Sequence, residues 1–255
     1  VPIDPLDIIK GNISLIHTIE PHIIGSDIVI NFVGILNESS GDQTFNNCHA
    51  VGPKNIAELC SKHKIDRLIH FSSIGADINS DAKYQVSKGL GEKNILDNFS
   101  SSTIIRPSIV FGPGDGFFTV QSKLVKLLPI VPLFSNNKFQ CVYVKDIAEG
   151  LIKILEDKET AGKIYEFGGP EVMTLKEIYQ LILNTLKIKR IILPLPLSFA
   201  NVTALLMKLS PSPMITFDQV KMLKKDNTVS DTPYNLSSLG ITAKSSRDII
   251  INYIS

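Results

Sequence analysis

Cysteine is scarce in this sequence of 255 residues, which has 3, at Cys48, Cys60 and Cys141, and no two of them form a C-x-x-C pair. An odd number of widely spaced cysteines argues against a disulfide framework and predicts free thiols in a reduced compartment. The histidines, at positions 17, 22, 49, 63 and 70, include no H-x-x-x-H pair. The sequence therefore predicts no metal site.

An excess of charge of one sign is also lacking, because the formal net charge is +1 and no basic stripe is present. This argues against a nucleic-acid partner. The N-terminus has no basic region followed by an apolar run, so we expect no secretory signal. The most apolar stretch, residues 191–207, contains two prolines and several polar residues and is too short for a membrane span. We interpret it as a loop followed by a core or interface helix; the alternative is contact with a membrane surface.

Short apolar runs alternate with helical patterns in the first half of the chain, which is typical of a parallel sheet covered by helices. We predict strands at 28–33, 67–72 and 102–106, with helices at 44–63 and 82–98 between them. Pro53 either kinks the first of these helices or marks its start. The fold class is α/β, with a soft boundary near residue 115 between the sheet domain, 1–115, and a smaller, mainly helix-rich lobe, 116–255.

In the second half, the residue pattern predicts a helix within 117–134 that is ended by prolines. It also predicts strand-helix units at 138–157 and 163–186. Further helices are expected at 198–209, 216–225 and 245–254. Thr174 and Glu177 have the spacing of a capping box. Asp146 is interpreted as an N-terminal helix cap and not as an acid catalyst.

Small and polar residues follow the predicted strands, where ligands of parallel sheets bind. Ser72 and Ser73 end one strand, and the next helix carries Tyr84 and Lys88, which share a face because they are one turn apart. A lysine charge would lower the tyrosine pKa from ~10. The tyrosine could then transfer a proton beside a nicotinamide. The alternatives are a solvated helix face and strand-end capping by the serines. His70 is interpreted as a buried structural residue.

Six stretches then identify a family: "VINFVG", "LIHFSSIGAD", "YQVSK", "IIRPSIVFGPGDGFF", "VYVKDIAEG" and "YEFGGPEVMTLKEI". In their order and spacing the chain resembles extended and atypical short-chain dehydrogenases/reductases, which include the NAD-dependent epimerases/dehydratases. It is most similar to the group typified by the NADPH-binding alpha-subcomplex accessory subunit of mitochondrial complex I and its bacterial relatives. "FSSIGAD", "FGPGDGFF" and "DQVKMLKKDNTVS" carry that similarity. The resemblance implies a Rossmann-like fold.

The resemblance also implies roles for particular residues. Tyr84 matches the proton-transferring tyrosine and Lys88 the lysine that also holds the nicotinamide ribose. Ser73 matches the third catalytic residue, with Ser72 as the alternative. The other positions that match cofactor-binding segments are Asn12, on the adenine side, Asn31, Val33 and Gly34, near the adenine-side ribose, and Pro107, Ser108, Ile109 and Val110, against the nicotinamide.

One departure from the family is large, because the sequence contains no G-x-x-G-x-x-G turn and its first glycine is Gly11. That turn normally holds the cofactor pyrophosphate. We therefore expect an N-terminally truncated sheet and weakened binding of NADP or NAD.

Two classes of function follow from the resemblance and stay open. The first is an NAD(P)-dependent oxidoreductase or epimerase that acts on a carbonyl, an alcohol or a sugar nucleotide. The second is a non-catalytic structural or cofactor-sensing subunit of a respiratory or quinone-biosynthesis assembly. The implied location is the bacterial cytoplasm or the mitochondrial matrix side, with at most peripheral contact with the inner membrane.

Overall fold

A parallel sheet forms the centre of the computed structural model, which describes residues 7–39, 41–207 and 216–254. Its strand order is β1 (Ile28–Asn31), β2 (Arg67–Phe71), β3 (Thr103–Pro107) and β8 (Ile164–Phe167). Every neighbouring pair in this sheet is parallel. The predicted α/β class and the three predicted parallel strands are confirmed. The fourth strand, β8, comes from the predicted lobe, and the boundary near residue 115 stays a prediction.

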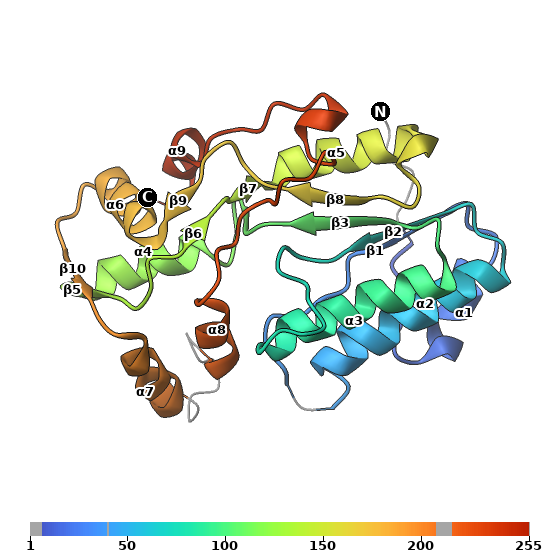
Figure 1. Cartoon of the computed structure of the whole chain (residues 1–255), viewed down its shortest axis with the longest axis horizontal. Coiled ribbons are helices and arrows are strands. Elements are labelled where there is room, and N and C mark those ends of the chain that lie inside the picture. Colours follow the sequence, from blue (N-terminus) through green and yellow to red (C-terminus); the bar gives the residue numbers. More distant parts are fainter. Residues whose placement is uncertain (1–6, 40, 208–215, 255) are drawn as a thin grey trace.

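Helices cover both faces of the sheet (Figure 1). On one face Leu68 of β2 packs in an apolar cluster with α1 (Ile16–Ile23), α2 (Gly52–Lys62) and α3 (Lys83–Asn98). On the other face Ile69 packs in a cluster that includes residues of α5 (Val144–Glu156). Leu68 and Ile69 are 1% and 0% exposed. This double burial explains why the strand sequence is nearly continuous in apolar residues.

The helix predicted at 44–63 is confirmed in two parts. A π-helical segment, η1 (Asn46–Val51), leads directly into α2, and Pro53 occupies one of the first two positions of the regular α-helix. Proline has no N–H to donate, so it is tolerated in a first helical turn, where that group has no partner within the helix. Pro53 therefore marks the start of α2, which was one of the two predicted alternatives.

The second part of the chain contains more strands than the sequence predicted. The helix expected within 117–134 ends at Leu127, as α4 (Phe118–Leu127), and β5 (Ile130–Leu133) follows it. β5 pairs in parallel with β10 (Ile191–Pro194), a partner that lies far away in the sequence. The remaining short strands are β4 (Val110–Phe111), β6 (Lys138–Phe139), β7 (Val142–Tyr143) and β9 (Met173–Thr174).

The helices predicted for the second part are present at nearly the expected places. They are α6 (Leu175–Leu186), α7 (Leu197–Met207), α8 (Phe217–Met222) and α9 (Ser246–Ile249), with short 3-10 turns at Lys158–Thr160, Ser237–Leu239 and Ile250–Asn252. Positions 208 and 209 of one predicted helix lie outside the described residues. The capping box formed by Thr174 and Glu177 is confirmed at the start of α6.

The interpretation of Asp146 as a helix cap is wrong. Helix α5 begins at Val144, and its N-cap is Tyr143. Asp146 therefore lies inside the first turn, where it is 0% exposed and its Oδ2 accepts a hydrogen bond of 2.7 Å from the backbone N–H of Lys244. The carboxylate fastens the C-terminal segment to α5, a contact between residues 98 apart that local sequence does not reveal.

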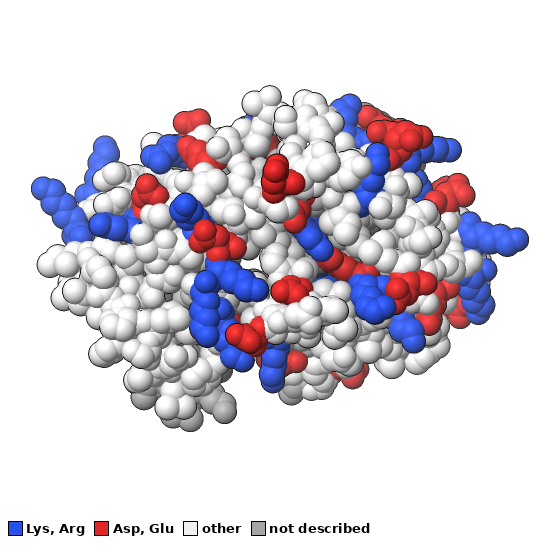
Figure 2. All heavy atoms as spheres, viewed as in Figure 1, with Lys and Arg blue, Asp and Glu red and all other residues white. Residues whose placement is uncertain are grey.

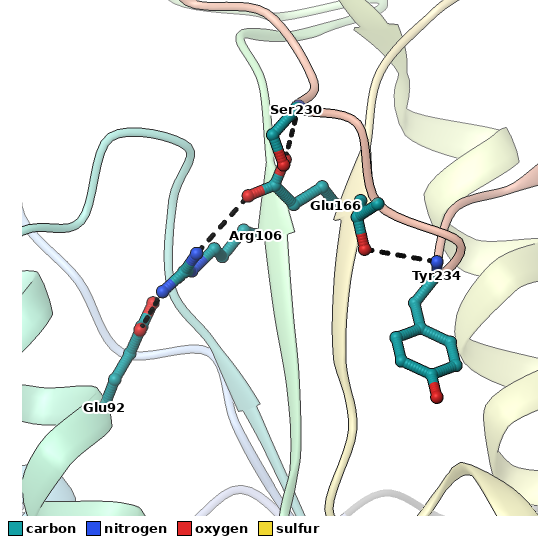
Figure 3. Close-up of polar contacts among 6 residues, drawn as sticks. Glu92, Arg106, Glu166, Ser230 and Tyr234 are labelled. Carbon is teal, nitrogen blue, oxygen red and sulfur yellow. Dashed lines mark hydrogen bonds and ion pairs between the residues drawn. The ribbon is translucent and has the colours of Figure 1, made fainter.

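A buried network of charges joins α3, β3 and β8 (Figure 3). The Arg106 guanidinium donates to both carboxylate oxygens of Glu92, at 2.8 and 2.6 Å, and to Glu166 at 3.3 Å. The second oxygen of Glu166 accepts a hydrogen bond of 2.7 Å from the backbone N–H of Ser230. Both glutamates are less than 9% exposed. Each buried carboxylate therefore has the partners that compensate for its desolvation.

Replacing Arg106 by methionine should lower the free energy of unfolding by about 3–5 kcal/mol, because two buried carboxylates lose their partner. The matched control is Lys93→Met, which breaks the exposed Lys93–Asp97 pair and should cost no more than about 1 kcal/mol. Urea denaturation of both variants measures the difference. Equal losses in the two variants would contradict a stabilising role for the buried network.

Candidate active site

Tyr84 and Lys88 lie on the first two turns of α3, beside the carboxyl end of β2. The Lys88 ammonium donates a hydrogen bond of 2.8 Å to the carbonyl oxygen of Phe71, the last residue of β2. Lys88 is only 4% exposed. Burial lowers the pKa of Lys88 to about 8, and the nearby Glu92 carboxylate acts in the opposite direction. At neutral pH the site therefore contains a cation that is poorly solvated.

Two glycines in the "SKGLGEK" segment allow α3 to pack closely against η1 and the loop after β2. A Cβ atom at Gly91 would lie 2.0 Å from the carbonyl oxygen of His49 in η1. A Cβ atom at Gly89 would lie 2.8 Å from the backbone nitrogen of Ile78. Both distances are shorter than a real carbon atom can approach. The lack of a side chain at these positions is thus what places the helix against η1 and the loop after β2.

The Tyr84 ring is partly buried in an aromatic environment, with edge-to-face contacts to Phe45 and His49 at centroid distances of 5.8 and 5.4 Å. Burial raises the pKa of the Tyr84 phenol, and hydrogen bonding to Ser73 partly offsets this effect. The sequence predicted a pKa lowered by Lys88, and this prediction is wrong. Desolvation dominates at the buried phenol, and the Lys88 ammonium donates to the Phe71 carbonyl oxygen.

The two serines that follow β2 differ in what they face. Ser73 is the one whose hydroxyl lies beside the Tyr84 phenol. Within the described part of the chain, neither Ser72 Oγ nor Ser73 Oγ has a hydrogen-bond partner of regular geometry, and both atoms are shielded from water. Buried hydroxyls normally find partners. The Ser73 hydroxyl, which has only the Tyr84 phenol beside it, and the Ser72 hydroxyl are therefore groups that a bound polar molecule could satisfy.

His49, which sequence reasoning did not single out, connects the site to the turn after β1. Its Nε2 accepts a hydrogen bond of 2.9 Å from the Ile35 N–H, and its Nδ1 lies 2.9 Å from Ser87 Oγ. Ser87 Oγ in turn donates to the Tyr84 carbonyl oxygen at 2.7 Å. These contacts are mutually consistent only if a neutral His49 carries its proton on Nδ1. A lone histidine in a helical pattern gives no sequence signal for such a role.

The electrostatic environment keeps His49 neutral. Burial and then the Lys88 charge lower the pKa of His49 to about 4. The pKa of His70 is also well below its ordinary value, through burial and then the charge of Lys88. His70 is 1% exposed, and its Nδ1 lies 3.1 Å from Asn31 Nδ2. Its burial agrees with the interpretation of His70 as a buried structural residue.

The turn after β1 lies against the lysine. Asn31 is buried and its Oδ1 accepts a hydrogen bond of 3.0 Å from the Val33 N–H, so its side chain stabilises the turn from inside. Val33 and Gly34 are exposed. A Cβ atom at Gly34 would lie 3.5 Å from His49 Nε2 and 3.9 Å from Lys88 Nζ. The structure thus brings the predicted turn and Lys88 together.

The structure does not bring Asn12 into this group through its polar atoms. The Asn12 side chain donates to Asp42 Oδ2 at 3.0 Å and accepts from the Ser14 N–H at 3.0 Å. It thereby stabilises the backbone just before α1. Its role in contacting an adenine stays a prediction.

The segment after β3 divides between two environments. The Pro107 carbonyl oxygen accepts a hydrogen bond of 3.0 Å from the Ile74 N–H, which keeps Pro107 next to the serines. Ser108 is buried and donates to Asn227 Oδ1 at 2.6 Å, and Ile109 packs against the core of the second part. Val110 is 38% exposed. Of the four predicted nicotinamide-side residues, Pro107 is therefore tied directly to the serine segment.

Neither a metal site nor a membrane span is found in the described ranges. No group of three or more histidine, cysteine, aspartate or glutamate side chains there could hold a metal ion. None of the helices in the same ranges is both long and apolar enough to cross a membrane.

The burial of Lys88 should make stability depend on pH. The folded-state pKa of about 8 lies below the ordinary 10.5, so the unfolded chain binds more protons between these values. Relative to Lys88→Met, the wild-type chain should gain about 3 kcal/mol of unfolding free energy as the pH rises from 7.5 to 10.5. It should lose this amount again as the pH falls. Urea denaturation at both pH values measures the difference, and parallel pH profiles would contradict it.

His49 should titrate at about pH 4 in the folded chain, because burial and Lys88 disfavour its protonated form. Nitrogen-15 NMR should find Nδ1 protonated at neutral pH, with Nε2 as the acceptor. The Ile35 amide resonance should shift with the same midpoint, since protonation of Nε2 removes its acceptor. A His49→Gln variant identifies the resonance. A midpoint near the ordinary 6.5 would show that the imidazole is not buried as described.

Comparison with known proteins finds a matching family and similar chains. Residues 4–168 match the model of the NAD dependent epimerase/dehydratase family. Subunit 9 of the NADH dehydrogenase (ubiquinone) 1 alpha subcomplex of Dictyostelium discoideum, a mitochondrial protein, is 32% identical over 230 residues, which cover 88% of this chain and 64% of that protein. The 40 kDa subunit of NADH-ubiquinone oxidoreductase of Neurospora crassa is 27% identical over 242 residues, which cover 93% of this chain and 63% of that protein. The chain thus spans less than two thirds of the length of these relatives.

Solved structures share the fold at low sequence identity. A nucleoside-diphosphate-sugar epimerase from Staphylococcus aureus has a TM-score of 0.73 and 14% identity, covering 96% of this chain and 83% of that one. MoeE5 in complex with UDP-glucose and NAD has a TM-score of 0.70 and 15% identity, and the match covers 96% of this chain and 83% of that one. The predicted Rossmann-like α/β fold is confirmed. Because the family model matches more than half of the length of this chain, the chain belongs to the NAD dependent epimerase/dehydratase family.

Proposed function

We propose that this chain holds the nicotinamide end of NADP or NAD, with Ser73, Tyr84 and Lys88 as the reacting set, in a protein of the complex I accessory-subunit type. The observation that carries the proposal is the buried Lys88 ammonium at the end of β2, one turn from Tyr84, with the Ser73 hydroxyl beside the phenol. Burial of this charge is costly. A ligand that needs a cation at this point explains why it is retained.

The residues present fit the nicotinamide half of the cofactor. The Lys88 ammonium has three donors, and the Phe71 carbonyl oxygen accepts from one of them, so the other donors can serve ribose hydroxyls. Pro107 to Val110 would contact the nicotinamide side. Asn31, Val33 and Gly34 form the turn beside this lysine and would lie near the adenine-side ribose. The bound nicotinamide would supply or accept a hydride.

In this proposal Tyr84 transfers a proton to a substrate carbonyl or takes one from an alcohol. Ser73 donates a hydrogen bond to the same substrate oxygen and holds it beside the phenol. Lys88 serves to hold the nicotinamide ribose, since burial and not the lysine charge sets the direction of the Tyr84 pKa shift. His49 holds the Tyr84 backbone through Ser87 while the proton moves.

The phosphate half of the cofactor fits less well. No G-x-x-G-x-x-G turn occurs in the 255 residues, and backbone amides of such a turn are the usual partners of the pyrophosphate. We therefore propose weak binding by this chain and stronger binding by a version extended with a glycine-rich β-α-β unit. The residues do not favour NAD over NADP.

A second candidate function is a non-catalytic, cofactor-sensing or structural subunit of a respiratory assembly. Two observations favour it: burial raises the Tyr84 pKa, and the serine hydroxyls are shielded from water. The relatives from Dictyostelium and Neurospora are named as subunits of NADH dehydrogenase and NADH-ubiquinone oxidoreductase. Under either function we place the protein on the matrix side of mitochondria or in the bacterial cytoplasm, with at most peripheral membrane contact.

Calorimetric titration of NADPH and NADH tests the cofactor proposal. Lys88→Met should weaken binding by about tenfold or more, because a charged hydrogen-bond donor to the ribose is lost. Lys93→Met, on the exposed face of the same helix, should leave the affinity unchanged. Loss of the buried charge should not unfold the variant, since that charge is desolvated in the wild type. Equal affinities for the wild type and Lys88→Met would refute the assignment.

The Tyr84→Phe variant distinguishes the two candidate functions when both its cofactor affinity and its rate of NADPH oxidation are measured. If Tyr84 transfers a proton, this variant binds the cofactor normally but loses about 10²–10⁴-fold in the rate of NADPH oxidation by a carbonyl substrate. If the protein is a non-catalytic subunit, no carbonyl compound, alcohol or sugar nucleotide supports turnover by the wild type.

A further inference from the structure

The helix that carries Tyr84 and Lys88 has no cap of its own. Its N-cap residue is Ala82, whose side chain cannot accept a hydrogen bond, and the first turn of α3 contains no acidic residue. The first N–H groups of any α-helix have no acceptor within the helix. A helix of 16 residues also presents a positive dipole end at this point. The N–H groups without an acceptor and the positive dipole end both favour an anion from elsewhere in the chain.

Asp218 provides that anion from the second part of the chain. Its Oδ1 accepts a hydrogen bond of 2.7 Å from the Lys83 N–H, and its Oδ2 accepts one of 2.9 Å from the Tyr84 N–H. Asp218 lies 134 residues after Tyr84, in helix α8. One carboxylate thus satisfies two adjacent backbone donors, and one of them belongs to the tyrosine itself.

Helix α8 is well anchored as a support for this carboxylate. Its own N-terminus is closed by a capping box between Thr216 and Gln219, which fixes Asp218 in the first turn. Val220, on the same short helix, is 2% exposed and packs in a cluster with Ala200 and Ala204 of α7. The position of Asp218 is therefore set by its capping box and by the packing of α8 on α7.

Two more polar contacts join the region of α8 to the approach to α3. Lys221 Nζ donates to the Asp81 carbonyl oxygen at 3.0 Å, and Lys225 Nζ lies 3.6 Å from Asp77 Oδ2. Basic and acidic side chains gather where α8 lies in the view of Figure 1 (Figure 2). These contacts orient α8 toward the loop that follows β2.

We propose that Asp218 is a positioning residue for Tyr84, through which the second part of the chain sets the geometry of the reacting tyrosine. The proposal deepens the proposed function and rests on it. Both backbone polar groups of Tyr84 are held by side chains, the N–H by Asp218 and the carbonyl oxygen by Ser87. Because both carboxylate oxygens of Asp218 already accept these bonds, its action on the site is indirect.

The test is NMR on the 255-residue chain with labelled tyrosine, comparing wild type, Asp218→Ala and Asp218→Asn. In Asp218→Ala the Tyr84 amide should exchange about tenfold faster or more, since its charged acceptor is gone. Contacts of the Tyr84 ring with Phe45 and His49 should weaken, and the titration midpoint of its phenol should fall as the ring becomes more exposed. Asp218→Asn keeps an acceptor oxygen and should restore part of the protection.

The matched control is Asp226→Ala, which removes a carboxylate that accepts from the Lys138 N–H in the second part of the chain. It should leave the Tyr84 amide and ring unchanged. Wild-type behaviour of Tyr84 in both Asp218 variants would overturn the proposal. So would a uniform acceleration of exchange throughout the chain, because it would indicate only global destabilisation.

The outcome is separable from that of the proposed function. A disturbed Tyr84 in Asp218→Ala, together with unchanged NADPH affinity in Lys88→Met, would support the positioning role and refute the cofactor assignment. The reverse pair of results would retain the cofactor site and remove Asp218 from its description.

Discussion

A buried ammonium group is the feature on which the rest of the site depends. Removing the Lys88 charge from water is costly, and the surrounding groups are arranged to compensate. The Phe71 carbonyl oxygen accepts its hydrogen bond, and the Glu92 carboxylate adds a favourable charge that is shared with Arg106. The two nearest histidines, His49 and His70, are held neutral by the same burial and charge. The hydrogen bonds of η1, β1 and β2 around the site follow from that neutrality.

Local sequence patterns predicted most of the sheet and its helices, because each apolar run or helical period is contained within one element. The pair Tyr84 and Lys88 could be found for the same reason, since residues one turn apart share a helix face. The elements that were missed depend on distant partners. Strand β5 exists because β10 pairs with it, and the Asp146 carboxylate accepts from Lys244, which is 98 residues away.

The same limit applies to the chemistry of the site. Sequence spacing placed a positive charge near the Tyr84 phenol, but it could not show that the phenol would be buried, so that desolvation raises its pKa. The predicted lowering of the tyrosine pKa was therefore wrong. His49 and Asp218 were missed because each acts on backbone groups, at Ile35 and Tyr84, and such contacts leave no pattern of side chains in the sequence.

The contact between Gly91 and the His49 carbonyl oxygen determines which parts of the site can move. Helix α3 and η1 meet backbone against backbone at this point, without a side chain to act as a cushion. A shift of one towards the other would produce a clash, so the close packing blocks movement in that direction. The loop before α3 is held differently, because exposed lysine side chains of α8 and of the turn after it reach Asp81 and Asp77.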